Sequence, residues 1–169
     1  MIFLTVGTQF PFDRLVTAVD RIAGEKIIDE EIFAQIGESS YIPKNFKAIK
    51  KMDAELFERF IRNSTAIISH SGMGTIENAL KYEKPMLVLP RLKKFGEVVN
   101  DHQLAIAKRF EDNGYLLAAC DEKDLRAKIF DLKTFTPQKR ISTSEAIIQR
   151  ISKFLNSINK EIYDYSARK

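Results

Sequence analysis

A run of small and polar residues, SHSGMGT at positions 69–75, stands between an apolar β-type run and a helical pattern. The first N–H groups of a helix have no partner within it, and the helix dipole adds partial positive charge there. Glycines let an anion approach such backbone closely. We therefore expect a phosphate or diphosphate to bind here, with Gly72 or Gly74 at positive φ and Thr75 as a cap or a phosphate contact. The candidate residues are Ser71, Gly72, Met73, Gly74 and Thr75.

A purely structural interpretation of this stretch stays open, because turns into helices often use Gly, Ser and Thr only to turn and cap. The spacing is not G-x-G-x-x-G, since Glu77 occupies the place of the third glycine. It is not a P-loop either, since no lysine follows Gly74. The motif alone does not choose between the two interpretations.

Three neighbouring side chains add chemistry to this stretch. His70 ends the strand as a ligand contact, an acid or base, or a histidine bonded within the loop. We place Glu77 and Asn78 in the first helical turn, where either could bind a ribose and where an acid would also complement the dipole. The chain has only two histidines and no carboxylate at ligand spacing on the same element, so we expect no metal site.

A second polar cluster, NDHQ at 100–103, opens a later helix after the basic segment RLKK. Asn100 and Gln103 have capping-box spacing, and the same amides suit sugar hydroxyls. Arg91 could screen a diphosphate. Gly7 follows the first apolar run and begins a further glycine loop.

Apolar runs that alternate between strand and helix patterns position these residues. We expect strands at 2–6, 31–37, 46–52, 65–69, 85–90 and 115–119. We expect helices at 11–23, after an Asp53 cap, after the glycine stretch, at 100–112 and at 122–132. This order predicts an α/β fold, a Rossmann-like three-layer parallel sheet with helices on both faces. Ligands of such sheets bind at the carboxyl ends of the strands, where the loops 7–12 and 70–75 would meet.

The C-terminal part is expected to be separate from this sheet. The segment KTFTPQKR reads as a linker, and Ser142 and Glu145 have capping-box spacing at the start of a final helix with an apolar stripe. We therefore expect a Rossmann-like domain over 1–135, with the phosphate-binding stretch in it. Over 136–169 we expect a linker and a helix that packs on this domain or docks a partner subunit.

Composition limits the function classes. The 169 residues carry a net charge of +4, which is compatible with a phosphate-bearing ligand or an anionic membrane surface. The basic clusters lack interleaved aromatics, so we expect no nucleic-acid partner. Cys120 is the single cysteine, and no apolar run is long enough to span a membrane, so we expect a reducing, cytoplasmic location.

Four segments, in this order, resemble one protein family: TVGTQFPFDRL, QIGESSYIP, SHSGMGTIENALKYEKPMLVLPR and NDHQLAIAKRFEDNGY. Over about residues 1–132 they resemble the donor-binding half of a GT-B glycosyltransferase, of the MurG C-terminal type. Stand-alone versions of that domain are more similar still. These are the catalytic subunit of the split dolichol-pathway N-acetylglucosaminyltransferase and the PssE-like subunits of exopolysaccharide synthesis.

This resemblance implies a UDP-sugar site. The diphosphate would meet residues 71–75, and Gly7 and Thr8 would lie near the cleft. Asn78 stands where the family usually carries a ribose-binding glutamate, and the acid is shifted by one position to Glu77. The segment that faces the donor sugar would contribute Asn100, His102 and Gln103.

The resemblance also implies an activity. The chain would be the catalytic subunit of a two-chain inverting glycosyltransferase that needs no cofactor or metal. It would transfer a hexose, hexuronic acid or N-acetylhexosamine to a polyprenyl-diphosphate-linked sugar in exopolysaccharide or capsule synthesis. A membrane-anchored PssD-like subunit would bind the acceptor and recruit the chain to the cytoplasmic face of the membrane. The general base would be His70 or a group of the partner.

Two other classes stay open. One is a non-catalytic nucleotide-sugar-binding subunit that completes or recruits a partner's active site. The other is a nicotinamide-dependent oxidoreductase on the same sheet, against which the missing third glycine counts.

Overall fold

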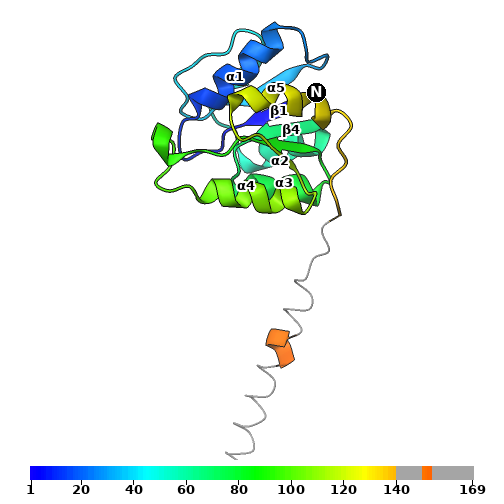
Figure 1. The fold of residues 1–169 in the computed structure, drawn as a ribbon. Coiled ribbons are helices and arrows are strands. Elements are labelled where there is room, and N and C mark those ends of the chain that lie inside the picture. The colour runs from blue at the N-terminus through cyan, green and yellow to red at the C-terminus, as the bar shows by residue number, and fades with distance from the viewer. Residues whose placement is uncertain (140–149, 154–169) are drawn as a thin grey trace, which may run out of the picture. The chain divides into compact units, whose positions relative to one another are not determined.

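Six short strands form one parallel sheet in the order β3-β2-β1-β4-β5-β6 (Figure 1). The computed structural model describes residues 1–139 and 150–153. The predicted strands are confirmed, and each is slightly shorter than expected. They could be predicted because the strands of a parallel sheet are covered on both faces and therefore appear in the sequence as apolar runs. The strands are β1 Ile2–Thr5, β2 Ile32–Gln35, β3 Lys47–Ile49, β4 Ala66–Ser69, β5 Met86–Val88 and β6 Leu117–Ala118.

Five α-helices connect or follow these strands within residues 1–139. The predicted Asp53 cap is confirmed, since its side chain accepts from the backbone N–H of Leu56 at 2.7 Å. Asp121 caps another helix start by accepting from two backbone N–H groups. The helices are α1 Asp13–Gly24, α2 Ala54–Asn63, α3 Met73–Lys81, α4 His102–Asp112 and α5 Glu122–Leu132, and a 3-10 turn, η1, spans Lys93–Phe95.

The helices cover both faces of the sheet, as Figure 1 shows, with α1 and α5 on one side and α2, α3 and α4 on the other. Alternation along β1 separates the two cores. Leu4 packs toward α1 and α5, whereas Phe3 packs into the opposite cluster, with its ring 5.7 Å from that of Phe57 and 5.3 Å from that of Phe60. Burial of these apolar surfaces on both faces stabilises the sheet. The sheet in turn holds the loops that follow its strands at one edge.

The strand order reverses at β1, which lies between β2 and β4. The chain leaves β1 toward α1 on one face and leaves β4 toward α3 on the other. In open parallel sheets this divergence creates a crevice at the carboxyl edge where ligands bind. The two glycine loops identified in the sequence therefore face each other across the switch point.

The start of α4 differs from the predicted capping box. The N-cap is Asp101, and Asn100 Oδ1 accepts from the backbone N–H of His102 at 3.2 Å. Gln103 does not reach back to the cap. Its side chain is buried, and its Oε1 accepts from the backbone N–H of Arg91 at 3.1 Å. A buried amide needs a partner, and this one finds it across the loop rather than on its own helix.

Residues 1–139 form one compact unit. Residues 150–153, within the predicted final helix, are helical, and the remainder of that helix lies outside the described residues. Its packing on the domain or on a partner, and the boundary near 135, stay predictions. Within the described residues, no helix has the length and apolar character needed to cross a membrane.

Candidate functional site

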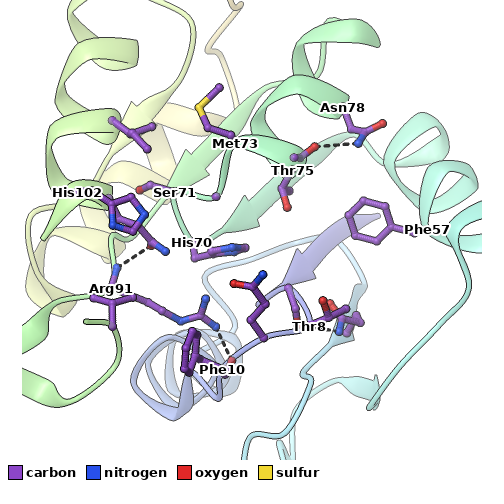
Figure 2. A pocket seen from close by; sticks show the side chains of 18 of the residues that line it. Thr8, Phe10, Phe57, His70, Ser71, Met73, Thr75, Asn78, Arg91 and His102 are labelled. Atoms are coloured by element: carbon purple, nitrogen blue, oxygen red, sulfur yellow. Dashed lines mark hydrogen bonds between the residues drawn. The ribbon is translucent and has the colours of Figure 1, made fainter. Parts of the chain in front are cut away.

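A cavity of about 870 Å³ opens at the carboxyl edge of the sheet, between the loops that follow β1 and β4 (Figure 2). Other walls come from the start of α2, from α3 and from the segment leading into α4. The structure brings all the predicted site residues except Glu77 to this cavity; their roles toward a ligand stay predictions. They are Gly7, Thr8, His70, Ser71, Gly72, Met73, Gly74, Thr75, Asn78, Arg91, Asn100, His102 and Gln103.

Asn78 and Glu77 are neighbours on α3, but only Asn78 faces the cavity. Because α3 begins at Met73, neither residue lies in its first turn as predicted, and that turn holds no acid. Asn78 lies one turn after Gly74, whose carbonyl accepts from Asn78 Nδ2 at 2.8 Å, and it faces the cavity. Glu77 is exposed and does not line the cavity. The geometry favours Asn78 for a contact with the ligand.

A row of buried polar side chains stands at the carboxyl ends of three neighbouring strands, and one of them, Gln35, lines the cavity. Thr5, Gln35 and Ser69 are the last residues of β1, β2 and β4 and lie in register across the sheet. Thr5 Oγ1 donates to Gln35 Oε1 at 2.6 Å, and Gln35 Nε2 donates to the carbonyls of Gly7 at 3.0 Å and Lys50 at 3.1 Å. These bonds hold Gly7 at a φ of +74°, a conformation that glycine adopts readily.

Sequence reasoning missed this row, although a signal for it exists. Each of these strands is apolar until its final residue, which is polar and can hydrogen-bond. Such a residue at the carboxyl end of a buried strand falls on the edge where ligands bind.

The imidazole of His70 lies between the two glycine loops. A Cβ on Gly7 would stand 2.8 Å from its Cε1, and a Cβ on Gly72 would stand 2.2 Å from its Nε2. The prediction of positive φ at Gly72 or Gly74 is wrong, since neither is among the positive-φ glycines. Gly72 has a φ of −81° and lacks a side chain because the ring occupies that space. A Cβ on Gly74 would meet nothing within 4 Å, so this glycine leaves open space.

The low pKa of His70 argues against a role as general base in the chain on its own. Burial, and then the positive charge of Arg91, lowers the pKa of His70 from 6.5 to about 3. A base of that pKa is poorly matched to removing a proton from a hydroxyl near neutral pH. Its Nδ1 lies 3.1 Å from Ser69 Oγ.

Arg91 is built into the protein rather than facing an open diphosphate site. Its side chain is 2% exposed, and its Nη2 donates to the carbonyls of Val6 at 2.7 Å and Phe10 at 2.6 Å. Figure 2 shows Arg91 reaching toward the backbone beside Phe10. Burial lowers the pKa of Arg91 to about 10, which still leaves a cation at neutral pH. Arg91 thus fixes the loop after β1 and adds positive charge to the cavity wall.

The start of α3 offers free donors to the cavity. Its N-cap is Gly72, and no side chain caps it. The prediction that Thr75 could cap is therefore wrong, because Thr75 lies inside the helix. Beside this end, Ser71 Oγ is buried and has no hydrogen-bond partner. Uncapped helix N–H groups and an unpartnered hydroxyl at one place match an acceptor-rich anion.

Apolar residues that were not predicted line other parts of the cavity. Met52 and Phe57 border it at the start of α2, and Val98, Val99 and Ile106 lie near α4. Figure 2 shows the Phe57 ring beside the cavity, across from the loop that carries Thr8. Met52 and Phe57 flank the Asp53 cap at the spacing of a hydrophobic staple, in which two apolar side chains pack together at a helix start. That spacing indicated local packing and gave no sign of a ligand site.

The two carboxylates of the cavity wall are already engaged. Asp53 caps α2, and Glu58 bonds Lys81 and the hydroxyl of Tyr82. Within residues 1–139 and 150–153, no group of three His, Cys, Asp or Glu side chains could hold a metal ion.

Comparison with known proteins gives the following matches. The family described as "Glycosyltransferase family 28 C-terminal domain" matches residues 1–162. The human UDP-N-acetylglucosamine transferase subunit ALG13 is 28% identical over 124 residues, covering 68% of this chain and 10% of that protein. A Clostridium tetani UDP-N-acetylglucosamine--N-acetylmuramyl-(pentapeptide) pyrophosphoryl-undecaprenol N-acetylglucosamine transferase is 37% identical over 76 residues, covering 45% of this chain and 20% of that protein. The chain thus matches only a tenth to a fifth of the length of these curated relatives.

Solved structures share the fold. The solution structure of ALG13 aligns with a TM-score of 0.60 at 21% identity, covering 89% of this chain and 93% of that one. The crystal structure of Acinetobacter baumannii MurG aligns with a TM-score of 0.55 at 18% identity, covering 79% of this chain and 42% of that one. The predicted Rossmann-like half of a GT-B fold is confirmed.

Proposed function

Because the chain belongs to the glycosyltransferase family 28 C-terminal domain family, we propose that it is the UDP-sugar-binding catalytic subunit of a two-chain inverting glycosyltransferase. It transfers a hexose, hexuronic acid or N-acetylhexosamine to a polyprenyl-diphosphate-linked sugar in exopolysaccharide or capsule synthesis. The names of the relatives support a UDP-sugar donor, and one of them is named as a subunit. The four sequence segments that resemble PssE-like proteins support the polysaccharide role.

The observation that carries the proposal is the pairing of the uncapped α3 N-terminus with the unpartnered Ser71 Oγ at the switch-point cavity. A diphosphate at this place accepts hydrogen bonds from both. The same donors stabilise the negative charge that develops on the leaving diphosphate during transfer, which is an electrostatic contribution fixed in advance by the fold. A metal ion is not needed for that task.

The remaining parts of a nucleotide-sugar fit the other walls. Phe57 and Met52 offer an apolar surface to the base, and Asn78 offers an amide to the ribose. Asn100 and His102, which are exposed at the opposite wall, are available to sugar hydroxyls. This order follows the cavity from α2, across the start of α3, to the start of α4.

The partner subunit supplies the acceptor site and the general base. The low pKa of His70 and the engaged carboxylates of the cavity wall support this division. A membrane-anchored, PssD-like partner would bring the chain to the membrane surface where the polyprenyl acceptor lies. The second candidate, a non-catalytic donor-binding subunit, rests on the same observation. It predicts that no substitution in this chain changes the transfer rate without also changing donor affinity.

Calorimetric titration with UDP, UDP-N-acetylglucosamine, UDP-glucose and NAD tests the donor site. Gly74→Val fills the open space beside the start of α3 and is expected to abolish UDP binding while leaving the thermal unfolding curve unchanged. Glu77→Ala is the matched control on the same helix and is expected to bind UDP as the unaltered chain does. UDP that fails to bind, or NAD that binds in its place, contradicts the proposal.

A further inference from the structure

The hydrogen bonds of Ser69 determine which ring nitrogen of His70 holds its hydrogen. Ser69 Oγ lies 2.6 Å from the carbonyl oxygen of Thr5. A carbonyl cannot donate, so the single hydroxyl hydrogen of Ser69 points to Thr5. The contact of 3.1 Å between Ser69 Oγ and His70 Nδ1 therefore needs its hydrogen on Nδ1.

We propose that Ser69 is a positioning residue that holds His70 as the neutral Nδ1–H tautomer and leaves the Nε2 lone pair bare beside Gly72. The strand pairing fixes Ser69, because Thr5 and Ser69 are direct partners in the β1–β4 register. The two glycines leave room for the ring, because a Cβ on either one would overlap it. Turning the serine or the imidazole breaks the bond between them or the bond from Ser69 to Thr5.

The surroundings favour the neutral ring. His70 is 9% exposed, and the charged group that acts on it is the Arg91 guanidinium. Both burial and a nearby cation disfavour a second proton on the imidazole. The ring therefore has one hydrogen, and the bond to Ser69 uses it.

A bare Nε2 selects the chemistry of its ligand partner. An imidazole nitrogen with a lone pair only accepts hydrogen bonds, whereas the oxygens of a diphosphate at neutral pH only accept as well. The substrate group that meets Nε2 is therefore a hydroxyl or an N–H, and the diphosphate stays at Ser71 and the start of α3. This consequence rests on the proposed function. The tautomer itself does not.

The tautomer is read directly from the nitrogen spectrum of the free protein at neutral pH. The chain has only two histidines, so a His102→Gln variant assigns the His70 signals. The unaltered chain should show hydrogen on Nδ1 and a bare Nε2. Ser69→Thr, which keeps the hydroxyl, should preserve this pattern, and Ser69→Ala should lose it. Hydrogen on Nε2 in the unaltered chain, or an unchanged pattern in Ser69→Ala, overturns the proposal.

Proton uptake tests the consequence at the ligand. Titration of UDP-N-acetylglucosamine at pH 7, in two buffers of different ionisation enthalpy, should give equal binding enthalpies, since Nε2 stays unprotonated. Uptake of about one proton, lost in His70→Gln, would mean that a phosphate oxygen meets a protonated ring and would overturn the proposal. A chain that binds no UDP-sugar contradicts the proposed function instead, and the nitrogen spectrum still decides the role of Ser69.

Discussion

The floor and the rim of the cavity differ in what their polar groups bond. The floor comprises Gln35, His70 and Arg91, which are buried and line the cavity, and the rim comprises Phe57, Asn78, Asn100 and His102. Floor bonds mostly join distant parts of the chain, such as Arg91 to Val6 and Gln35 to Gly7. The rim amides bond only neighbours, Asn78 to Gly74 and Asn100 to His102.

This difference separates two tasks. Most floor groups bond protein partners, so they shape the cavity and contribute to the stability of the domain. Rim groups have hydrogen-bonding capacity left over, so they can meet a ligand with little effect on folding. Substitutions in the two regions should therefore separate stability from binding.

The largest expected effect is at Arg91. Arg91→Leu removes the donors to the Val6 and Phe10 carbonyls and leaves them without partners near the buried loop. We expect a loss of about 3 kcal/mol in the free energy of unfolding, measured by urea titration. Lys94→Ala, an exposed charge on the same segment, is the control and should change stability by less than about 0.5 kcal/mol. Equal stability of both variants would place Arg91 in the rim instead.

Two glycines of one loop give the next contrast. Gly72→Ala places a methyl group 2.2 Å from His70 Nε2, whereas Gly74→Ala meets nothing within 4 Å. We expect Gly72→Ala to lose about 2 kcal/mol of stability through overpacking. Gly74→Ala should be as stable as the unaltered chain or more so, since alanine favours a helix. Thermal unfolding of both variants measures this, and a reversed order would contradict the position of the imidazole.

The buried imidazole of His70 should also make the free energy of unfolding of the domain depend on pH. The pKa of His70 is about 3 in the folded chain and 6.5 as the ordinary value, so below pH 6.5 the unfolded chain binds a proton that the folded chain does not. Stability present above pH 6.5 is therefore lost as the pH falls toward 3. Between pH 7.5 and pH 5.5 the loss should be on the order of 1 kcal/mol. His70→Gln should remove this part of the dependence, and urea titrations at both pH values would show whether it does.

The smallest expected effect on stability belongs to the rim. Asn78→Ala should weaken UDP binding about tenfold, which corresponds to roughly 1.4 kcal/mol, with an unchanged unfolding curve. Glu77→Ala should change neither, because that side chain is exposed outside the cavity. Calorimetric titration of the two variants decides between them. A loss of affinity in Glu77→Ala alone would mean that Glu77, and not Asn78, contacts the ribose.

The sequence by itself determined the fold and the place of the site. Alternating apolar runs gave the order of strands and helices, and the right-handed crossover rule then leaves few ways to arrange a parallel sheet. The glycine stretch followed a buried strand, so it had to fall on the carboxyl edge. These inferences succeeded because they depend on local periodicity and on rules that hold for every sheet of this kind.

Only the tertiary structure decided which residues of the site are free. Gly72 looked like a place for positive φ, but it is small because His70 fills its space. Arg91 was a candidate to screen a diphosphate, but its guanidinium donates to carbonyls of another loop. Gln103 looked like part of a cap, but it bonds the backbone of Arg91. For Arg91 and Gln103 the deciding partner lies elsewhere in the chain, and a local pattern carries no record of a contact that forms only when the sheet brings distant loops together. For Gly72 the partner is two residues away, but the direction in which its ring points is set by the tertiary packing.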